Sequence, residues 1–117
     1  MTVLFEYPAP EAALARTKAA DPRVAERFEV YACGVELANG FGELTDSSEQ
    51  RLRFTEAMRE KQRRYGERYP IDEEFLEAIA LMPQASGVAL GFDRLVMLAS
   101  GALRIDQVVW TPPAGEL

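Results

Sequence analysis

The stretch Ser86–Leu98 constrains the fold of this chain most, because its pattern predicts a buried strand that runs directly into a helix. Every second position of the strand carries a small residue, which leaves room for something to lie against the backbone. These small residues are Gly87, Ala89 and Gly91. Asp93 is expected to cap the helix, and Arg94 then lies on its first turn, where a guanidinium can bind a phosphate or a carboxylate. The alternative is a purely structural corner in which Arg94 pairs with a nearby acid.

A second informative stretch, Arg23–Leu44, alternates apolar and polar residues on both sides of Cys33-Gly34, which is typical of a two-residue hairpin turn. A regular hairpin around this turn pairs Glu29 with Ala38 and places Glu29 and Glu36 on one face, as diagonal neighbours about 7–8 Å apart. Two carboxylates so placed suit a divalent cation that carries a polyphosphate. The alternative is a solvated sheet face that carries two unrelated acids.

The same stretch continues into Asn39-Gly40-Phe41-Gly42-Glu43, in which two glycines flank an aromatic residue. This spacing predicts a bulge or a close approach of the backbone to a ligand, with Glu43 suited to an amine and Phe41 to its aliphatic part. In a regular strand the odd-numbered residues here point away from the face that carries Glu36. A pocket shared by both sets therefore requires a twist or bulge near Gly40. The alternative is that Asn39-Gly40 is itself a hairpin turn.

The remaining elements follow from periodicity and from helix and strand breakers. Helices are predicted over Asp46–Arg64, with its first residue as the cap, and over Glu73–Leu81. A strand is predicted over Thr2–Tyr7 and a loop with one helical turn over Pro10–Ala20. Arg104–Trp110 is predicted to form a turn and a short strand.

Composition excludes several classes of function. The chain has 117 residues, enough for one domain with a modest core. It has one cysteine and no histidine, which excludes an intrachain disulfide, a cysteine-based zinc site and histidine-based acid–base catalysis. A net charge of −6 argues against a general nucleic-acid-binding surface. No signal-type or membrane-spanning apolar run is evident, so we expect a cytoplasmic protein whose metal, if it holds one, is Mg²⁺ bound by carboxylates.

Two motifs, in this order, resemble the C-terminal part of the class II lysyl-tRNA synthetase catalytic domain. The first motif is RFEVYACGVELANGFGELTDSSEQRLRF and the second is SGVALGFDRLVML, which resembles motif 3 with Ala89 in place of the middle glycine. The segments GVELANGF and GVALG are most similar to the PoxA/GenX/EpmA branch, paralogues that attach β-lysine to a lysine of elongation factor P. The resemblance implies an α+β fold: an antiparallel β-sheet with helices packed on one face, the C-terminal fragment of the class II catalytic fold.

The resemblance also implies an ATP-binding set. Arg94 matches the motif 3 arginine, the catalytic residue that contacts the γ-phosphate of ATP and stabilises charge during adenylate formation. Glu29 and Glu36 match the acids that hold Mg²⁺ on the ATP.

An amino-acid pocket is implied in the same way. Asn39, Phe41 and Glu43 match contributors to the lysine pocket, and Gly91 matches the glycine that lets the backbone approach the bound aminoacyl adenylate. The methyl group of Ala89 would reshape that pocket, which fits a preference for β-lysine over lysine. The alternative is a minor variation of the strand.

The chain departs from the family in lacking motif 1, which builds the dimer, and motif 2, whose arginine binds the α-phosphate. We therefore expect residues 1–117 to be a single partial catalytic domain that is inactive alone. The implied parent activity is ATP-dependent activation of lysine or β-lysine and transfer to a lysine of elongation factor P, with tRNA the less favoured acceptor. The alternative is a non-catalytic module that binds a nucleotide, an amino acid or a partner protein.

An incomplete sheet of this kind is also expected to expose an apolar edge. The edge would pair with a second copy, giving a homodimer, or with the missing part of the domain. No membrane partner is expected.

Overall fold

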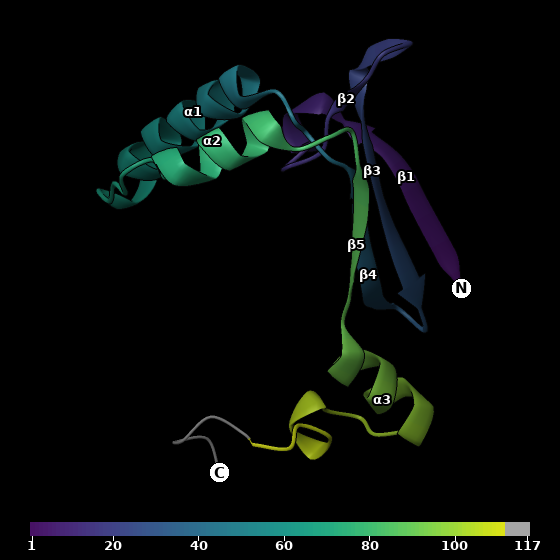
Figure 1. Ribbon diagram of the computed structural model, residues 1–117. Coiled ribbons are helices and arrows are strands. Elements are labelled where there is room, and N and C mark those ends of the chain that lie inside the picture. The colour runs from purple at the N-terminus through teal and green to yellow at the C-terminus, as the bar shows by residue number, and fades with distance from the viewer. Residues whose placement is uncertain (112–117) are drawn as a thin grey trace.

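The sheet is antiparallel throughout and is the centre of the molecule (Figure 1). The computed structural model describes residues 1–111. Its strands run in the order β1-β3-β4-β5, and the short β2 pairs with β3 on the side opposite β1. The strands are β1 (Thr2–Pro8), β2 (Thr17–Lys18), β3 (Asp21–Ala32), β4 (Val35–Gly42) and β5 (Ser86–Leu90). Together with the helices, this sheet confirms the predicted α+β class.

The helices lie toward the two ends of the sheet (Figure 1). The α-helices are α1 (Ser47–Tyr65), α2 (Glu73–Leu81) and α3 (Phe92–Ser100), and the short 3₁₀ helices are η1 (Ala9–Glu11) and η2 (Ile105–Gln107). Helices α1 and α2 pack side by side at one end, where the Phe54 and Phe75 rings lie 5.9 Å apart, and α3 continues from β5 at the other end. None of the described helices is long and apolar enough to cross a membrane.

Helix α1 begins at its predicted cap, but helix α3 does not. Asp46 accepts hydrogen bonds from the backbone N–H groups of Ser48 and Glu49. Helix α3, by contrast, begins at Phe92 with Gly91 as its N-cap, so the prediction that Asp93 caps it is wrong. The reason is that Gly91 joins the sheet to the helix: its N–H donates to the Leu37 carbonyl in β4, and its own carbonyl accepts the first helical hydrogen bond, from the Leu95 N–H. The short strand predicted within Arg104–Trp110 is also wrong, because η2 occupies its centre.

The hairpin of β3 and β4 has the predicted turn but not the predicted regular register. Cys33 and Gly34 have φ angles of 52° and 78°, as a two-residue turn with two positive φ angles requires. Tyr31 pairs with Glu36, but Val30 pairs with Ala38, so Leu37 is an extra residue in β4. This β-bulge places Glu29 opposite Asn39, which corrects the predicted pairing of Glu29 with Ala38.

The bulge changes which side chains share a face. Without it, Glu36 and Asn39 would point to opposite sides of the sheet, because side chains alternate along a strand. With it, both lie on the face that carries Glu29, which we call the site face. The bulge that a shared pocket requires is therefore present, at Leu37 rather than near Gly40.

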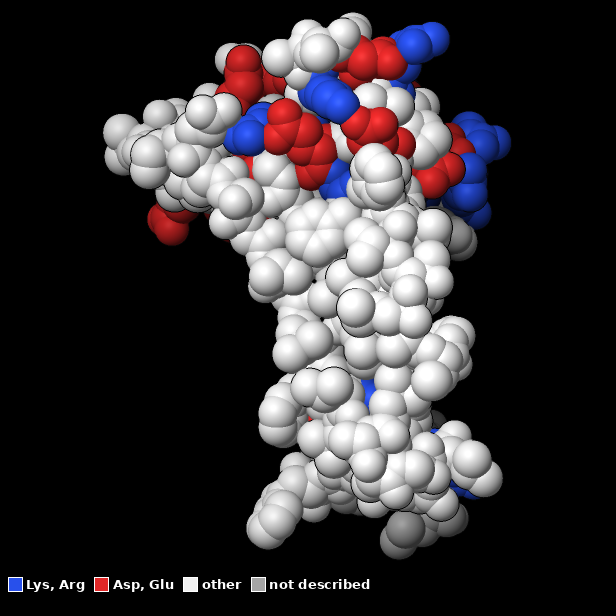
Figure 2. Space-filling model, turned by 90° about the vertical axis from the view of Figure 1, so that its right-hand side faces the viewer, with Lys and Arg blue, Asp and Glu red and all other residues white. Residues whose placement is uncertain are grey.

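The opposite face of the sheet, which we call the back face, is apolar and open. Its large side chains are Val3, Phe5, Phe28, Val30, Val88 and Leu90. Figure 2 shows charged side chains gathered at the end of the molecule near β2 and a surface almost free of charge toward α3.

All five residues of β5 are exposed, so the prediction that this strand is buried is wrong. Strand β5 is the last strand of the sheet, so its outer edge is where the expected exposed edge lies.

Candidate functional site

The site face gathers most of the residues singled out in the sequence. Strand β5 pairs with β4 so that Ala89 lies opposite Asn39 and Gly87 lies opposite Phe41. Paired residues share a face, so the site face runs from β3 across β4 to the free edge of β5. It carries Glu29, Glu36, Asn39, Phe41, Glu43, Ala89 and Gly91.

Glu29 lies at the centre of this face and is only 7% exposed. Its Oε1 accepts a hydrogen bond of 2.6 Å from Arg27, and its Oε2 accepts one of 2.6 Å from the Tyr31 hydroxyl. The hydrogen bonds from Tyr31 and Tyr7 are the main reason why the pKa of Glu29 lies below its usual range. Burial, helped by the contact with Glu29, raises the pKa of Tyr7 to about 12. Glu29 is therefore an ionised carboxylate held in place by its neighbours.

Arg27, Tyr31 and Tyr7 are site-face residues that the sequence analysis did not single out. Arg27 and Tyr31 stand two residues on either side of Glu29 in β3, so the alternation of the strand already placed them on the same face. Tyr7 comes from β1, whose register is shifted by a bulge at Glu6, and nothing in the local sequence indicates that contact.

Arg94 joins the first turn of α3 to the hairpin. Its Nη1 donates a hydrogen bond of 3.0 Å to the backbone carbonyl of Glu36 and lies 3.8 Å from the Glu36 Oε2. The stem of Arg94 fills the space that the missing side chain of Gly91 leaves, because a Cβ there would lie 3.3 Å from the Arg94 Cδ. Its side chain is 46% exposed, so the guanidinium combines an acid partner with donors open to solvent.

Glu43 uses the room left by Gly87 in β5. A Cβ on Gly87 would lie 2.9 Å from the Glu43 Oε1, so this carboxylate lies against the β5 backbone. Glu43 also lines a cavity of about 360 Å³ whose other walls are mostly apolar. These walls include Leu14, Leu44, Phe75, Ile79 and Met82. A carboxylate beside apolar walls suits an amine at the end of an aliphatic chain.

The carboxylates of the site face suit a hard cation only in part. Glu29 and Glu36 offer oxygen ligands of the kind that Mg²⁺ prefers. Within residues 1–111, however, no group of three or more acidic, histidine or cysteine side chains is placed to hold a metal ion. A Mg²⁺ ion bound at these two acids would therefore need further oxygens from its ligand, as phosphates provide.

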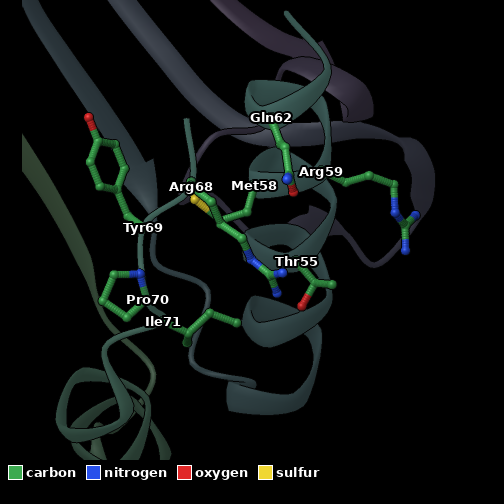
Figure 3. Close-up of a pocket in the computed structure, with 8 residues that line it drawn as sticks. All are labelled: Thr55, Met58, Arg59, Gln62, Arg68, Tyr69, Pro70 and Ile71. Atoms are coloured by element: carbon green, nitrogen blue, oxygen red, sulfur yellow. The ribbon is translucent and has the colours of Figure 1, made fainter. Parts of the chain in front are cut away.

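A separate cavity of about 400 Å³ lies between α1 and the segment 68–71 (Figure 3). It contains none of the predicted site residues. Near it, Arg63 and Arg64 both bind Glu60, while Lys61 lies 3.4 Å from Glu67.

A family model and a curated relative both place this chain among proteins related to class II tRNA synthetases. The family model "tRNA synthetases class II (D, K and N)" matches residues 1–114. The chain is 54% identical over 112 residues to the elongation factor P--(R)-beta-lysine ligase of Proteus mirabilis (strain HI4320). That alignment covers 95% of this chain and 34% of the relative, so the chain spans about a third of the relative's length.

Proposed function

Because the chain belongs to the class II tRNA synthetase family (D, K and N), we propose that its site face forms one side of a site that activates lysine or β-lysine with ATP. The observation that carries this proposal is the bulge at Leu37, since it brings the acids of the hairpin and the residues Asn39 and Phe41 onto one face. The identity to an elongation factor P ligase makes β-lysine the favoured amino acid.

In the proposed reaction the carboxylate of the amino acid attacks the α-phosphorus of ATP, giving an aminoacyl adenylate and pyrophosphate. Arg94 binds the γ-phosphate with the donors that face solvent and stabilises the charge that develops on the triphosphate. Glu29 and Glu36 would hold Mg²⁺, which when bound neutralises phosphate charge. These residues act by position and charge, and no side-chain general base is assigned.

The amino acid would lie along β4 and β5. Glu43 binds its side-chain amine, Phe41 covers its aliphatic part, and Asn39 contributes hydrogen bonds from the middle of the face. Gly91 lets the backbone approach the adenylate. Ala89 lies directly opposite Asn39, so its methyl group is placed to select between lysine and β-lysine.

The acyl group would then pass to a lysine of elongation factor P, with tRNA as the less favoured acceptor. We propose that the 117-residue chain does not catalyse activation alone, because the motif 2 arginine for the α-phosphate is absent from it. The missing side of the site would come from the rest of a catalytic domain or from a second copy, by pairing along the open edge of β5.

Thermal unfolding in the presence of ligands tests this proposal. A ligand at about 100 times its Kd stabilises a protein by about 2.7 kcal/mol. For a chain of this length that corresponds to a rise of about 11 °C in Tm. We expect Mg·ATP and β-lysine each to raise the Tm, and Arg94→Ala to abolish the response to Mg·ATP only. Arg59→Ala is the matched control, since Arg59 is exposed and pairs with Glu56 on its own helix.

A flat Tm with Mg·ATP, lysine and β-lysine would argue against a formed site. Pyrophosphate exchange by the chain alone, at a rate comparable to a full-length ligase, would contradict its proposed inactivity. The second candidate is a non-catalytic module that binds a nucleotide, an amino acid or a partner protein. An experiment that adds the remaining two thirds of a related ligase as a separate polypeptide distinguishes these two candidates. Restored pyrophosphate exchange favours the fragment of an enzyme, and a lack of exchange favours the non-catalytic module.

A further inference from the structure

Arg27 is the most extensively contacted cation on the site face. Its Nη2 donates a hydrogen bond of 2.6 Å to the Glu29 Oε1, and its Nη1 donates one of 2.6 Å to the Glu11 carbonyl. Its Nε makes a longer contact of 3.4 Å with the Asn39 Oδ1. The guanidinium carbon also lies 4.5 Å from the centre of the Tyr7 ring and 5.8 Å from that of Phe41.

These contacts leave Arg27 little freedom to reach a ligand itself. Its side chain is 17% exposed, all three of its nitrogens are engaged, and aromatic rings lie near the planar group. A guanidinium is suited to this task because its donors form a rigid fork and its surface stacks on aromatic rings. An ammonium group of the same charge has neither property.

The partners of Arg27 stand on the two sides of the proposed site. Glu29 belongs to the side that would hold Mg·ATP, while Asn39 and Phe41 belong to the side that would hold the amino acid. The contact with Oδ1 also fixes which way the Asn39 amide faces, so that its NH₂ group points away from Arg27. A free carboxylate and a free amide would each rotate among several orientations and bind a ligand less tightly.

We propose that Arg27 is a positioning residue that fixes the Glu29 carboxylate and the Asn39 amide for the two substrates. The role of Arg27 toward the two substrates rests on the function proposed above. Its role in fixing the Glu29 and Asn39 side chains rests on the contacts alone. Residues that orient the ligands of a metal typically change metal affinity or activity by about 10–100-fold when they are replaced. A residue that only packed the sheet would change stability and leave both side chains as they are.

The test compares Arg27→Gln and Arg27→Lys with the control Arg23→Gln in the 117-residue chain. Arg23 lies on the same strand, its side chain is 86% exposed, and it pairs with Asp21 two residues away. The first readout needs no ligand: the NMR shifts of the Glu29 carboxyl carbon and of the Asn39 side-chain amide. In Arg27→Gln we expect both groups to shift, because each loses its contact with the guanidinium; in Arg23→Gln we expect neither to shift.

The second readout is calorimetric affinity for Mg·ATP and for β-lysine. Arg27→Gln is expected to weaken Mg·ATP binding by about tenfold or more, with Arg27→Lys giving only partial rescue because it lacks the fork. Unchanged shifts of the Glu29 carboxyl carbon and of the Asn39 amide in Arg27→Gln would overturn the proposal. If Arg27→Gln does not fold, the test relies on Arg27→Lys. An unchanged NMR shift of the Asn39 amide together with wild-type affinity for Mg·ATP and β-lysine in that variant would refute the positioning role. If the wild-type chain binds neither ligand, the proposed function fails, and the first readout still judges Arg27.

Discussion

The Glu29 carboxylate allows a quantitative test of what holds the site face together. Replacing Glu29 with alanine removes its hydrogen bonds with Arg27 and Tyr31 and leaves the guanidinium without its acid. A hydrogen bond to a charged group contributes about 1.5–3 kcal/mol, and breaking a buried ion pair costs about 3–5 kcal/mol. Arg27 keeps its bond to the Glu11 carbonyl, so the lower end applies and we expect a loss of about 3 kcal/mol.

Chemical and thermal unfolding followed by circular dichroism measure this loss. With an unfolding entropy of about 2.1 cal/mol/K per residue, about 3 kcal/mol lowers the Tm of a 117-residue chain by about 12 °C. The matched control is Glu60→Ala, which removes a carboxylate that also binds two partners, Arg63 and Arg64, but on an exposed helix surface. We expect little change there, because solvent screens such pairs. If Glu29→Ala were no more destabilising than Glu60→Ala, Glu29 would not anchor the face.

Three further outcomes follow from the same geometry. The folded-state pKa of Glu29 is depressed, so the stability that this carboxylate contributes is present above the ordinary carboxyl pKa and is lost as the pH falls through the folded-state pKa. The urea midpoint of unfolding should therefore fall less steeply from pH 7 to pH 3 in Glu29→Gln than in the wild type. Asp46→Ala should cost about 1 kcal/mol, measured by urea unfolding, because Asp46 accepts the N–H groups of Ser48 and Glu49; an unchanged midpoint would contradict the cap. Gly87→Ala should displace the Glu43 carboxylate and weaken β-lysine binding in calorimetry while Mg·ATP binding stays unchanged; equal loss of both would point to a general distortion.

Local sequence signals predicted the elements that depend on local chemistry. The cap at Asp46, the helix Glu73–Leu81 and the turn at Cys33-Gly34 all occur where propensity and turn residues place them. The family motifs predicted residues of a shared site; those of the hairpin and of β5 lie on the site face, and Arg94 follows on α3.

What the sequence did not reveal depends on contacts between distant segments. The bulge forms at Leu37, whose carbonyl receives the N–H of Gly91 from beyond the two intervening helices, so no local pattern marks it. The same contact moves the start of α3 ahead of Asp93. The alternation of β3 placed Arg27 on the face of Glu29, but its contacts with Tyr7 and the Glu11 carbonyl come from the first strand and from η1, and no local pattern marks them.

The open edge of β5 has a consequence for the affinity of this chain for its ligands. Ala89 and Gly91 lie on or beside that edge, and Arg94 follows them directly. Any polypeptide that adds a strand along β5 therefore also forms a wall of the ligand site. Under the function proposed here, strand addition and ligand binding are then linked equilibria: each partner tightens the binding of the other by the same factor. The apparent affinity for β-lysine would accordingly rise with the concentration of whatever pairs with β5, and titrations of this chain are best read at several protein concentrations.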